Sequence, residues 1–248
     1  MRVEVFFGTS GITPQDIAGR VVAMIDVLRA STTIAAALDN GARAVIPLEN
    51  SDEAIRLAKT FERRDLRLAG ERRMLPIPGF DLGNSPGEFT RQAVEGKTIL
   101  MTTTNGTAAL AATQGARDVI VASYVNFSAS LSMLRAALRG ETDVAIICAG
   151  REKHFAFEDA GCAGRYVRHA SRRLVGVKVN DAAHASVLID KKYGDNIERL
   201  LGASEHARAL HEAGFGDDIA ACAKLDAHPV IPVYQDRQIT KLGPDRER

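Results

Sequence analysis

Short apolar runs that alternate with helical patterns are the feature of this sequence that most restricts its fold. Several runs are apolar throughout, which favours strands buried on both faces. The alternation predicts an α/β fold, a layered α/β/α arrangement around a mostly parallel sheet. The expected strands are Val3–Phe7, Val21–Ile25, Ala44–Ile46, Leu66–Ala69, Thr98–Thr102, Val119–Ala122, Val144–Cys148 and Val230–Val233, and the expected helices are Thr32–Leu38, Asp52–Arg63, Gly106–Ala112, Ser128–Leu138 and Glu158–Leu174.

The sequence also contains an internal repeat. Each copy contains a strand, a polar loop, an Ala-rich helix, a Gly-Ala-Arg turn and a second strand, and the first copy is three residues longer between its blocks. Unrelated βαβ units share this order, but the matching Gly-Ala-Arg favours a duplication of β-loop-α-β units. We therefore expect a single domain over residues 1–248, with repeat halves of about 1–95 and 96–248. The matching segments are Gly19–Ala30 with Gly96–Thr107, and Gly41–Ile46 with Gly115–Ile120.

Composition excludes several classes of protein. The 248 residues carry a formal charge of +1, so neither nucleic acid nor an anionic membrane is an expected partner. No apolar run approaches the roughly 18 residues that cross a bilayer, and the N-terminus reads as a strand rather than a signal peptide. Three scattered cysteines do not make a disulfide framework. We expect a reduced, cytoplasmic protein, and a homo-oligomer is compatible with these features.

Polar loops follow three of the expected strands, where ligands bind in parallel α/β sheets. They are Asp26–Thr33, Thr102–Thr107 and Ala149–Asp159. In the second loop, Thr hydroxyls, a glycine and a helix N-terminus are the ingredients of a phosphate cradle. The alternative is that a threonine only caps the helix while Asn-Gly forms a turn.

The first loop places opposite charges directly after an apolar strand. Arg29 offers a planar fork that binds anions, and Asp26 offers oxygen ligands for a hard cation such as Mg²⁺. The structural alternative is a salt bridge between these two residues. Further acids stand in suggestive places: Glu71 ends a short strand, and Glu158 opens an expected helix, where acids also complement the helix dipole.

Other phosphate and metal signatures are weak. The nucleotide P-loop pattern and the His and Cys patterns of zinc sites do not occur in the sequence. Cys162 and Arg168 match the spacing of cysteine phosphatases, but the segment reads as continuous helix rather than a cradle loop. Cys148, at a strand end, is expected to be a small buried residue. His154 lies in the third loop, whereas His206 and His211 are expected on helix surfaces.

Together these loops resemble the 2-phosphosulfolactate phosphatase (ComB-like) family. The resemblance runs in order over nearly the whole chain. It rests on Ile25-Asp-Val-Leu-Arg-Ala-Ser-Thr-Thr33, Gly79-Phe-Asp-Leu-Gly-Asn-Ser-Pro86, Thr103-Thr-Asn-Gly-Thr107, Cys148-Ala-Gly150, Glu158-Asp-Ala-Gly-Cys-Ala-Gly164 and the stretch from Gly214-Phe to Asp218.

The resemblance implies a Mg²⁺-dependent phosphatase that converts 2-phosphosulfolactate, a phosphorylated sulfonate, to sulfolactate on the route to coenzyme M. Carried over by motif, the expected catalytic residues are Asp26, Arg29, Glu158 and Asp159. The metal ligands are our own inference from the acids near these loops, and we expect Asp26, Asp81 and Glu71. The expected substrate-binding residues are Arg29, Asn84, Thr103, Thr104, Asn105, Gly106 and Thr107.

Two rival functions stay open at the level of sequence. One is a phosphatase for another small phosphorylated hydroxy acid, because the stretch from Lys153 to Phe157 departs from the familiar pattern. The other is a non-catalytic binder of small anions, which needs Arg29 and the threonine loop but no metal. The sequence also leaves undecided whether water attacks the phosphate directly or Asp26 first forms an aspartyl-phosphate.

Overall fold

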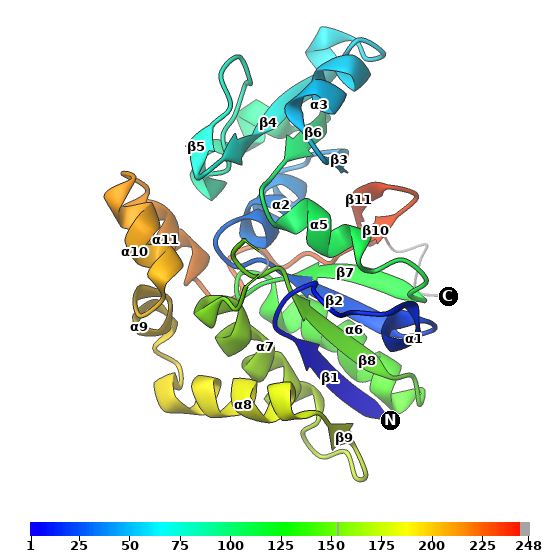
Figure 1. Cartoon of the computed structure of the whole chain (residues 1–248). Coiled ribbons are helices and arrows are strands. Elements are labelled where there is room, and N and C mark those ends of the chain that lie inside the picture. Colours follow the sequence, from blue (N-terminus) through cyan, green and yellow to red (C-terminus); the bar gives the residue numbers. More distant parts are fainter. Residues whose placement is uncertain (153, 244–248) are drawn as a thin grey trace.

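The computed structural model describes residues 1–152 and 154–243, and within them eleven strands form one sheet with helices on both sides (Figure 1). The strand order is β5-β4-β6-β3-β11-β10-β7-β2-β8-β1-β9. The strands are β1 (Arg2–Phe6), β2 (Val21–Ile25), β3 (Ala44–Leu48), β4 (Leu66–Arg72), β5 (Leu75–Pro76), β6 (Thr98–Thr102), β7 (Asp118–Ala122), β8 (Val144–Cys148), β9 (Lys178–Val179), β10 (Pro232–Gln235) and β11 (Gln238–Lys241). The α-helices are α1 (Pro14–Ile17), α2 (Ala30–Asp39), α3 (Ser51–Ala58), α4 (Arg91–Val94), α5 (Gly106–Ala111), α6 (Phe127–Arg139), α7 (Phe157–Ala170), α8 (Asp181–Tyr193), α9 (Ile197–Gly202), α10 (Glu205–Glu212) and α11 (Gly216–Cys222).

The sheet consists of two parallel blocks joined by a hairpin. Strands β7, β2, β8, β1 and β9 are parallel to one another, and so are β4, β6 and β3. The C-terminal hairpin β10–β11 lies between the blocks and pairs antiparallel with β7 on one side and β3 on the other. The two blocks therefore run in opposite directions across the hairpin, and in Figure 1 they form the lower and upper parts of the molecule.

The two copies of the internal repeat make reciprocal backbone contacts. Gly19 N–H donates to the Gly115 carbonyl at 3.2 Å, and Gly96 N–H donates to the Gly41 carbonyl at 2.8 Å. Gly19 and Gly96 share a φ of about +70°, and Gly41 and Gly115 a φ of about +90°, a region that glycine adopts without strain. Strand β2 of the first copy pairs with β7 of the second, and β6 pairs with β3. A duplication predicts this reciprocity, and the duplication itself stays a prediction.

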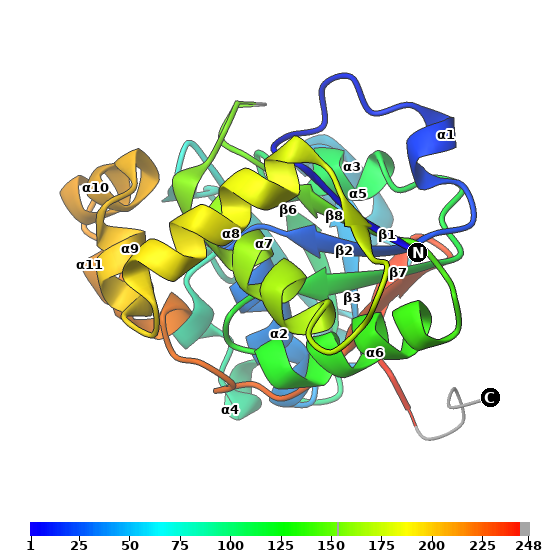
Figure 2. The same ribbon diagram turned by 90° about the horizontal axis from the view of Figure 1, so that it is seen from below.

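Alternating side chains of the strands build two of the three hydrophobic clusters. Val21, Ala23 and Ile25 of β2 face the cluster beneath α6 and α7, which cover one face in Figure 2. Val22 and Met24 face the opposite cluster, which includes α2, α5 and strands of both blocks. A third, smaller cluster lies between α3 and the block of β3, β4 and β6. The second cluster thus holds the two blocks together next to the loops that follow β2 and β6.

Most expected elements are confirmed. The bounds of β2, β6 and β8 agree with the sequence analysis to the residue. The strand expected at Val230–Val233 lies two residues later, as β10 at Pro232–Gln235, while α3 ends at Ala58 and α7 at Ala170. Strands β5, β9 and β11 were not expected. Helices α8, α9 and α11 were not expected as elements, and α10 was expected only as the helix that carries His206 and His211. Asn180, Asn196 and Ser204 accept hydrogen bonds at the starts of α8, α9 and α10, and these caps were the signals present in the sequence.

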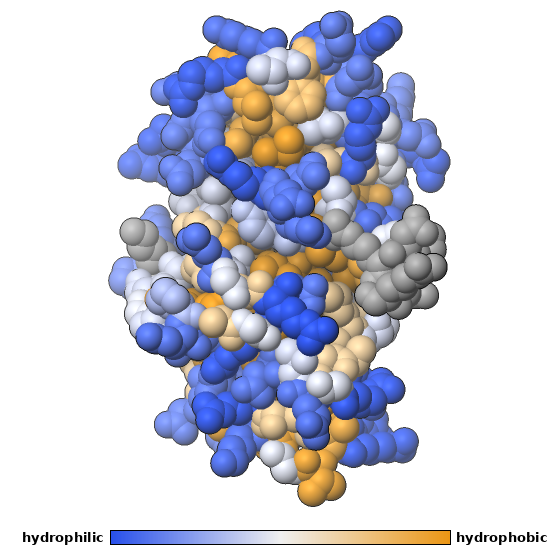
Figure 3. Space-filling model, turned by 90° about the vertical axis from the view of Figure 1, so that its right-hand side faces the viewer, coloured by the Kyte–Doolittle hydropathy of each residue, from blue (hydrophilic) through white to orange (hydrophobic). Residues whose placement is uncertain are grey.

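Hydrophilic side chains cover much of the face seen in Figure 3, with separate apolar patches among them. Across residues 1–152 and 154–243, no helix has both the length and the apolar character that crossing a membrane requires.

Candidate active site

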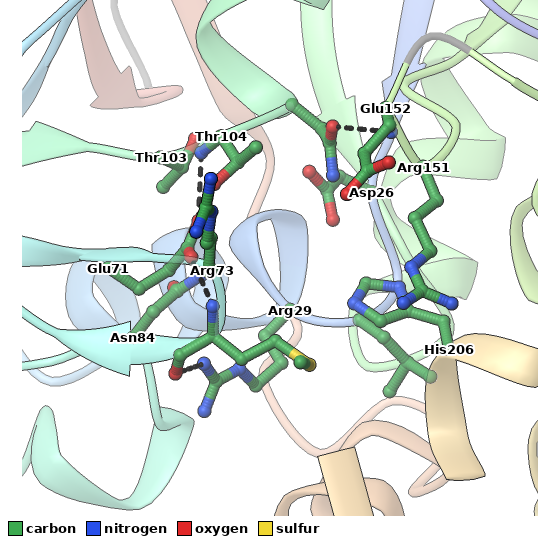
Figure 4. A pocket seen from close by; sticks show the side chains of 13 residues that line it. Asp26, Arg29, Glu71, Arg73, Asn84, Thr103, Thr104, Arg151, Glu152 and His206 are labelled. Atoms are coloured by element: carbon green, nitrogen blue, oxygen red, sulfur yellow. Dashed lines mark hydrogen bonds between the residues drawn. The ribbon is translucent and has the colours of Figure 1, made fainter. Parts of the chain in front are cut away.

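A cavity of about 230 Å³ lies where both blocks contribute loops from the carboxyl ends of their strands. The loops after β2 and β8 come from one block, and those after β4 and β6 from the other. In Figure 4, Asp26, Arg151 and His206 lie across the cavity from Thr103, Thr104, Glu71 and Asn84. The lining residues are Asp26, Leu28, Arg29, Glu71, Arg73, Met74, Asn84, Thr103, Thr104, Asn105, Arg151, Glu152 and His206.

Asp26 is a buried carboxylate without a cationic partner. Its exposed fraction is 6%, and none of the Lys, Arg or His side chains that the structure describes forms an ion pair with it. Burial raises the pKa of Asp26 to about 6; His206 lowers it, Glu71 and Glu158 raise it, and the Ala30 backbone N–H lowers it. Its own N–H donates to Ser31 Oγ at 2.8 Å, which fixes the turn into α2. The site therefore holds a carboxylate that an added cation would stabilise.

Arg29 lines the cavity but does not pair with Asp26, so the structural alternative of an Asp26–Arg29 salt bridge is wrong. Its Nη1 donates to Asp218 Oδ2 at 2.7 Å and to Ser85 Oγ at 3.2 Å, and its Nη2 donates to the Met74 carbonyl at 2.8 Å. Its guanidinium also stacks 4.5 Å from the centre of the Phe215 ring. A guanidinium has five N–H donors, so two stay available for a ligand.

Glu71 organises the threonine loop. Its Oε1 accepts hydrogen bonds from both the N–H and the hydroxyl of Thr104 at 2.8 Å, and its Oε2 accepts from Met74 N–H at 2.7 Å. Thr104 lines the cavity as expected, but these two donors serve Glu71. Thr103 also lines the cavity, and its hydroxyl has no protein partner within the described part of the chain.

The rest of the threonine loop only partly faces the cavity. Asn105 lines it and accepts a hydrogen bond from Glu152 N–H at 3.0 Å. Thr107 does not line it, since its hydroxyl donates to the Leu48 carbonyl at 3.3 Å. Gly106 lies behind the lining: a Cβ there would stand 3.1 Å from Ala30 Cβ and 3.3 Å from Asp26 Oδ2. Gly106 thus permits the close approach of this loop to the first one, and the prediction that Gly106 and Thr107 line the site is corrected.

Asn84 joins the cavity from the loop before α4. It is 5% exposed, and its Oδ1 has no hydrogen-bond partner in the described residues. Its carbonyl accepts a hydrogen bond from Thr33 Oγ1 at 2.9 Å, which fastens this loop to α2. A buried amide oxygen without a partner is costly, so its place in the cavity favours contact with a ligand or water.

Asp159 supports the site from behind. Its Oδ1 accepts from Val27 N–H at 2.8 Å and its Oδ2 from Gly150 N–H at 3.1 Å, so it ties the loops after β2 and β8 together. Burial, followed by the nearby charges of Glu158 and Asp26, raises the pKa of Asp159 well above its usual value. It is 2% exposed and not part of the lining, so its expected catalytic role is corrected to a positioning one.

Glu158 and His206 form a buried pair at the cavity. Glu158 Oε1 accepts a hydrogen bond from His206 Nδ1 at 3.0 Å, and their side chains are 2% and 11% exposed. Glu158 itself is not part of the lining, whereas His206 is. The expectation that His206 lies on a helix surface is therefore wrong. The sequence carries no local signal for this contact, which joins residues 48 positions apart.

Asp81 does not belong to the cavity. It pairs with Arg63 and accepts a hydrogen bond from Leu68 N–H at 2.8 Å. Burial alone would raise the pKa of Asp81, but these hydrogen bonds lower it below its usual value. The prediction that Asp81 is a metal ligand at this site is corrected, because its carboxylate already serves a loop outside the cavity.

The cysteine-phosphatase alternative is also wrong. Cys162 is fully buried within α7, and burial raises the pKa of its thiol well above the usual value, which opposes a thiolate nucleophile. Arg168 pairs with Asp190 rather than with a cradle loop. Cys148 is a buried residue at the end of β8, as expected.

Arg73 and Arg151 are cationic lining residues that the sequence analysis missed. Arg73 lies in the turn between β4 and β5 with a φ of +51°, and no carboxylate of the described chain forms an ion pair with it. Arg151 follows β8, and its Nη1 lies 3.7 Å from the exposed carboxylate of Glu205. Neither residue belongs to a recognisable motif. Arginines are common in surface turns, so their presence there did not indicate a binding site.

Within residues 1–152 and 154–243, no three His, Cys, Asp or Glu side chains form a group suited to holding a metal ion. The two carboxylates expected as ligands that do face the cavity are Asp26 and Glu71. Proteins usually bind Mg²⁺ through one or two carboxylates, with water and substrate phosphate completing its shell. The donor set therefore fits Mg²⁺ rather than a cage made of protein ligands alone.

Comparison with known proteins gives one consistent family. A family model described as 2-phosphosulpholactate phosphatase matches residues 8–237. A protein of Symbiobacterium thermophilum named probable 2-phosphosulfolactate phosphatase is 40% identical over 228 residues, which cover 92% of this chain and 97% of that protein. Proteins with the same name from Caldanaerobacter subterraneus and Caldicellulosiruptor saccharolyticus are 38% and 35% identical, covering 94% and 98% of this chain and 95% and 100% of their own lengths.

Proposed function

The chain belongs to the 2-phosphosulpholactate phosphatase family, and we propose that it hydrolyses the phosphate monoester of 2-phosphosulfolactate to sulfolactate and phosphate. The observation that carries this proposal is the cavity shared by both blocks, where the unpaired carboxylate of Asp26 lies near anion-binding groups. A site with both kinds of charge suits a phosphate ester bound together with a cation.

We infer that the phosphate lies between the loops after β2 and β6. Arg29 can direct its two remaining N–H donors to the phosphate, and Thr103 can add its hydroxyl. Glu71 holds Thr104, and Asp159 holds the loops after β2 and β8, so these donors are fixed before the substrate binds. Fixed donors stabilise developing charge without reorganisation during the reaction, which is a main source of catalysis in phosphoryl transfer.

We infer that Mg²⁺ is bound by Asp26, with Glu71 as the second carboxylate facing the cavity. When bound, Mg²⁺ would polarise the phosphoryl oxygens and offset the charge that makes a buried Asp26 unfavourable. Glu71 already accepts three hydrogen bonds, so Asp26 is the ligand whose loss has the larger effect.

Arg73 and Arg151 give the cavity two further cations for the other anionic groups of the substrate. The sulfonate and the carboxylate of 2-phosphosulfolactate each present at least two oxygens that can accept paired hydrogen bonds from one guanidinium. This pair favours a phosphorylated acid with more than one extra negative charge over a simple alkyl phosphate.

The test is a panel of phosphate esters assayed in parallel with Mg²⁺ and with EDTA. We expect the highest kcat/KM for 2-phosphosulfolactate, a lower value for 2-phospholactate, which lacks the sulfonate, and the lowest for an alkyl phosphate without a carboxylate. We also expect EDTA to remove the activity and Mg²⁺ to restore it. A higher kcat/KM for another phosphorylated hydroxy acid would reassign the substrate, and binding without turnover of any ester would favour the anion-binding alternative.

A further inference from the structure

We propose that His206 is the general acid of the reaction, donating a proton from its imidazole to the ester oxygen as the phosphate leaves, and that Glu158 is the positioning residue that holds its ring. The inference rests on the proposed phosphate monoester hydrolysis. It concerns how the leaving group is protonated, which neither the metal nor Arg29 accomplishes.

The backbone fixes His206 at the edge of the cavity. His206 is the second residue of α10, and Ser204 caps this helix by accepting a hydrogen bond from Ala207 N–H at 2.9 Å. Ala207 and Leu210 of the same helix are buried in the main hydrophobic cluster. The imidazole therefore reaches the cavity from a packed helix rather than from a loose loop (Figure 4).

The hydrogen bond to Glu158 decides which ring nitrogen faces the ligand. A carboxylate oxygen only accepts hydrogen bonds, so Nδ1 of His206 carries the proton donated to Glu158 Oε1 at 3.0 Å. The other nitrogen, Nε2, is left as the atom that can exchange a proton with a bound substrate. Glu158 is held on α7, nearly fully buried, so it sets the ring orientation without itself lining the cavity.

The chemistry needs such a proton. In the hydrolysis, a water oxygen forms a bond to phosphorus and the ester P–O bond breaks, with both electrons passing to the ester oxygen. The alkoxide of a secondary alcohol is a poor leaving group, and protonation by a positioned acid typically accelerates such steps by about 10²–10⁴-fold. The imidazolium gives its proton to this oxygen, the attacking water loses a proton to solvent, and a proton from solvent restores His206.

The alternative roles of His206 are structural support and simple anion binding. The charged groups around it are Glu158 on α7, Asp26 after β2, Arg151 after β8 and Glu205 on its own helix. A positively charged His206 among these groups would also attract the substrate anion without donating a proton to it. The experiment must therefore separate protonation of the leaving group from binding.

The experiment compares 2-phosphosulfolactate with its analogue in which sulfur replaces the bridging oxygen. A thiolate leaves without protonation, although both substrates present the same anions. We expect His206→Asn to lower kcat/KM for the oxygen ester by about 100-fold or more and for the sulfur analogue by less than about threefold. Glu158→Gln should show the same selectivity to a smaller extent. His211→Asn, on the exposed side of the same helix, is the matched control and should leave both rates unchanged.

Equal losses for both substrates in His206→Asn would overturn the proposal and assign His206 to binding or support. If this variant does not fold, kcat/KM of the wild-type enzyme is measured for a series of phosphate esters whose alcohols differ in pKa. A general acid makes kcat/KM nearly independent of the pKa of the leaving alcohol, so a steep dependence of kcat/KM on that pKa would overturn the proposal. Absence of turnover with every ester in the wild type would instead refute the proposed phosphatase function.

Discussion

Replacing Asp26 with Asn removes a charge that the folded chain buries at the cavity without a cationic partner among the described residues. Asn has nearly the shape of Asp, so the packing of the loop after β2 should survive. The change therefore separates the charge of Asp26 from its volume, and it tests both the stability and the metal site.

The magnitude follows from the pKa of Asp26, which burial raises from 3.8 to about 6. At a pH well above 6 this corresponds to at most about 3 kcal/mol by which the ionised carboxylate destabilises the metal-free fold. In a chain of this size about 1 kcal/mol moves Tm by about 2–4 °C, so Asp26→Asn should raise the metal-free Tm by up to about 6–12 °C.

The sign of the pH dependence is determined by the same shift. The unfolded chain releases the Asp26 proton near pH 3.8, and the folded chain only near pH 6. Wild-type stability therefore falls as pH rises between these values, so the gain from Asp26→Asn is absent below about pH 3.8, about half complete at pH 5 and complete above about pH 6.

The assay is thermal unfolding in EDTA at pH 5 and pH 8, followed by the same scans with Mg²⁺ and by steady-state kinetics. Asp26→Asn should shrink the Mg²⁺-induced rise in Tm and lower kcat by about 100-fold or more. Asp81→Asn is the matched control: hydrogen bonds from Arg63 and Leu68 lower its pKa despite partial burial, so its loss should not raise Tm at pH 8. A folded Asp26→Asn that is less stable than wild type at pH 8 in EDTA, or one that keeps full activity, would refute this account of Asp26.

Three further predictions concern the loops and the thiols. Arg29→Lys should lower kcat/KM at least about tenfold, which corresponds to about 1.4 kcal/mol of transition-state stabilisation. The reason is that an ammonium lacks the planar fork with which Arg29 can bind Asp218 and a phosphate at once. A variant with wild-type kcat/KM and wild-type inhibition by phosphate would contradict this. Iodoacetamide applied to the folded protein should leave activity intact, because Cys162 is buried with a raised pKa; loss that tracks its alkylation would contradict this. Gly106→Ala should lower kcat more than Tm, because the new Cβ would crowd Ala30 and Asp26 at 3.1 and 3.3 Å; unchanged kinetics would show that the loop yields freely.

The sequence by itself determined approximately where eight of the eleven described strands lie, and it pointed to loops that line the cavity. Apolar runs such as Val21–Ile25 bury both faces of a strand, and this local pattern depends little on the rest of the chain. Polar residues directly after strands are typical of ligand sites in α/β sheets, so the positions of Asp26, Thr103 and Glu71 marked them as site candidates. Their strands belong to blocks that run in opposite directions, so only the packing of the two blocks brings these residues to one cavity. The stretches that carry the family resemblance include the loops after β2 and β6.

Only the tertiary structure decided what these residues contact. Arg29 pairs with Asp218, 189 positions away, and His206 with Glu158, 48 positions away. Asp218 and His206 both lie in the helices between β9 and β10, and their local sequence does not indicate these contacts. The insertion of the β10–β11 hairpin between β3 and β7 was likewise not encoded in local periodicity. Periodicity reports which face of an element is apolar, whereas the partner of a buried charge depends on how distant elements pack, and that is settled only when the whole chain has folded.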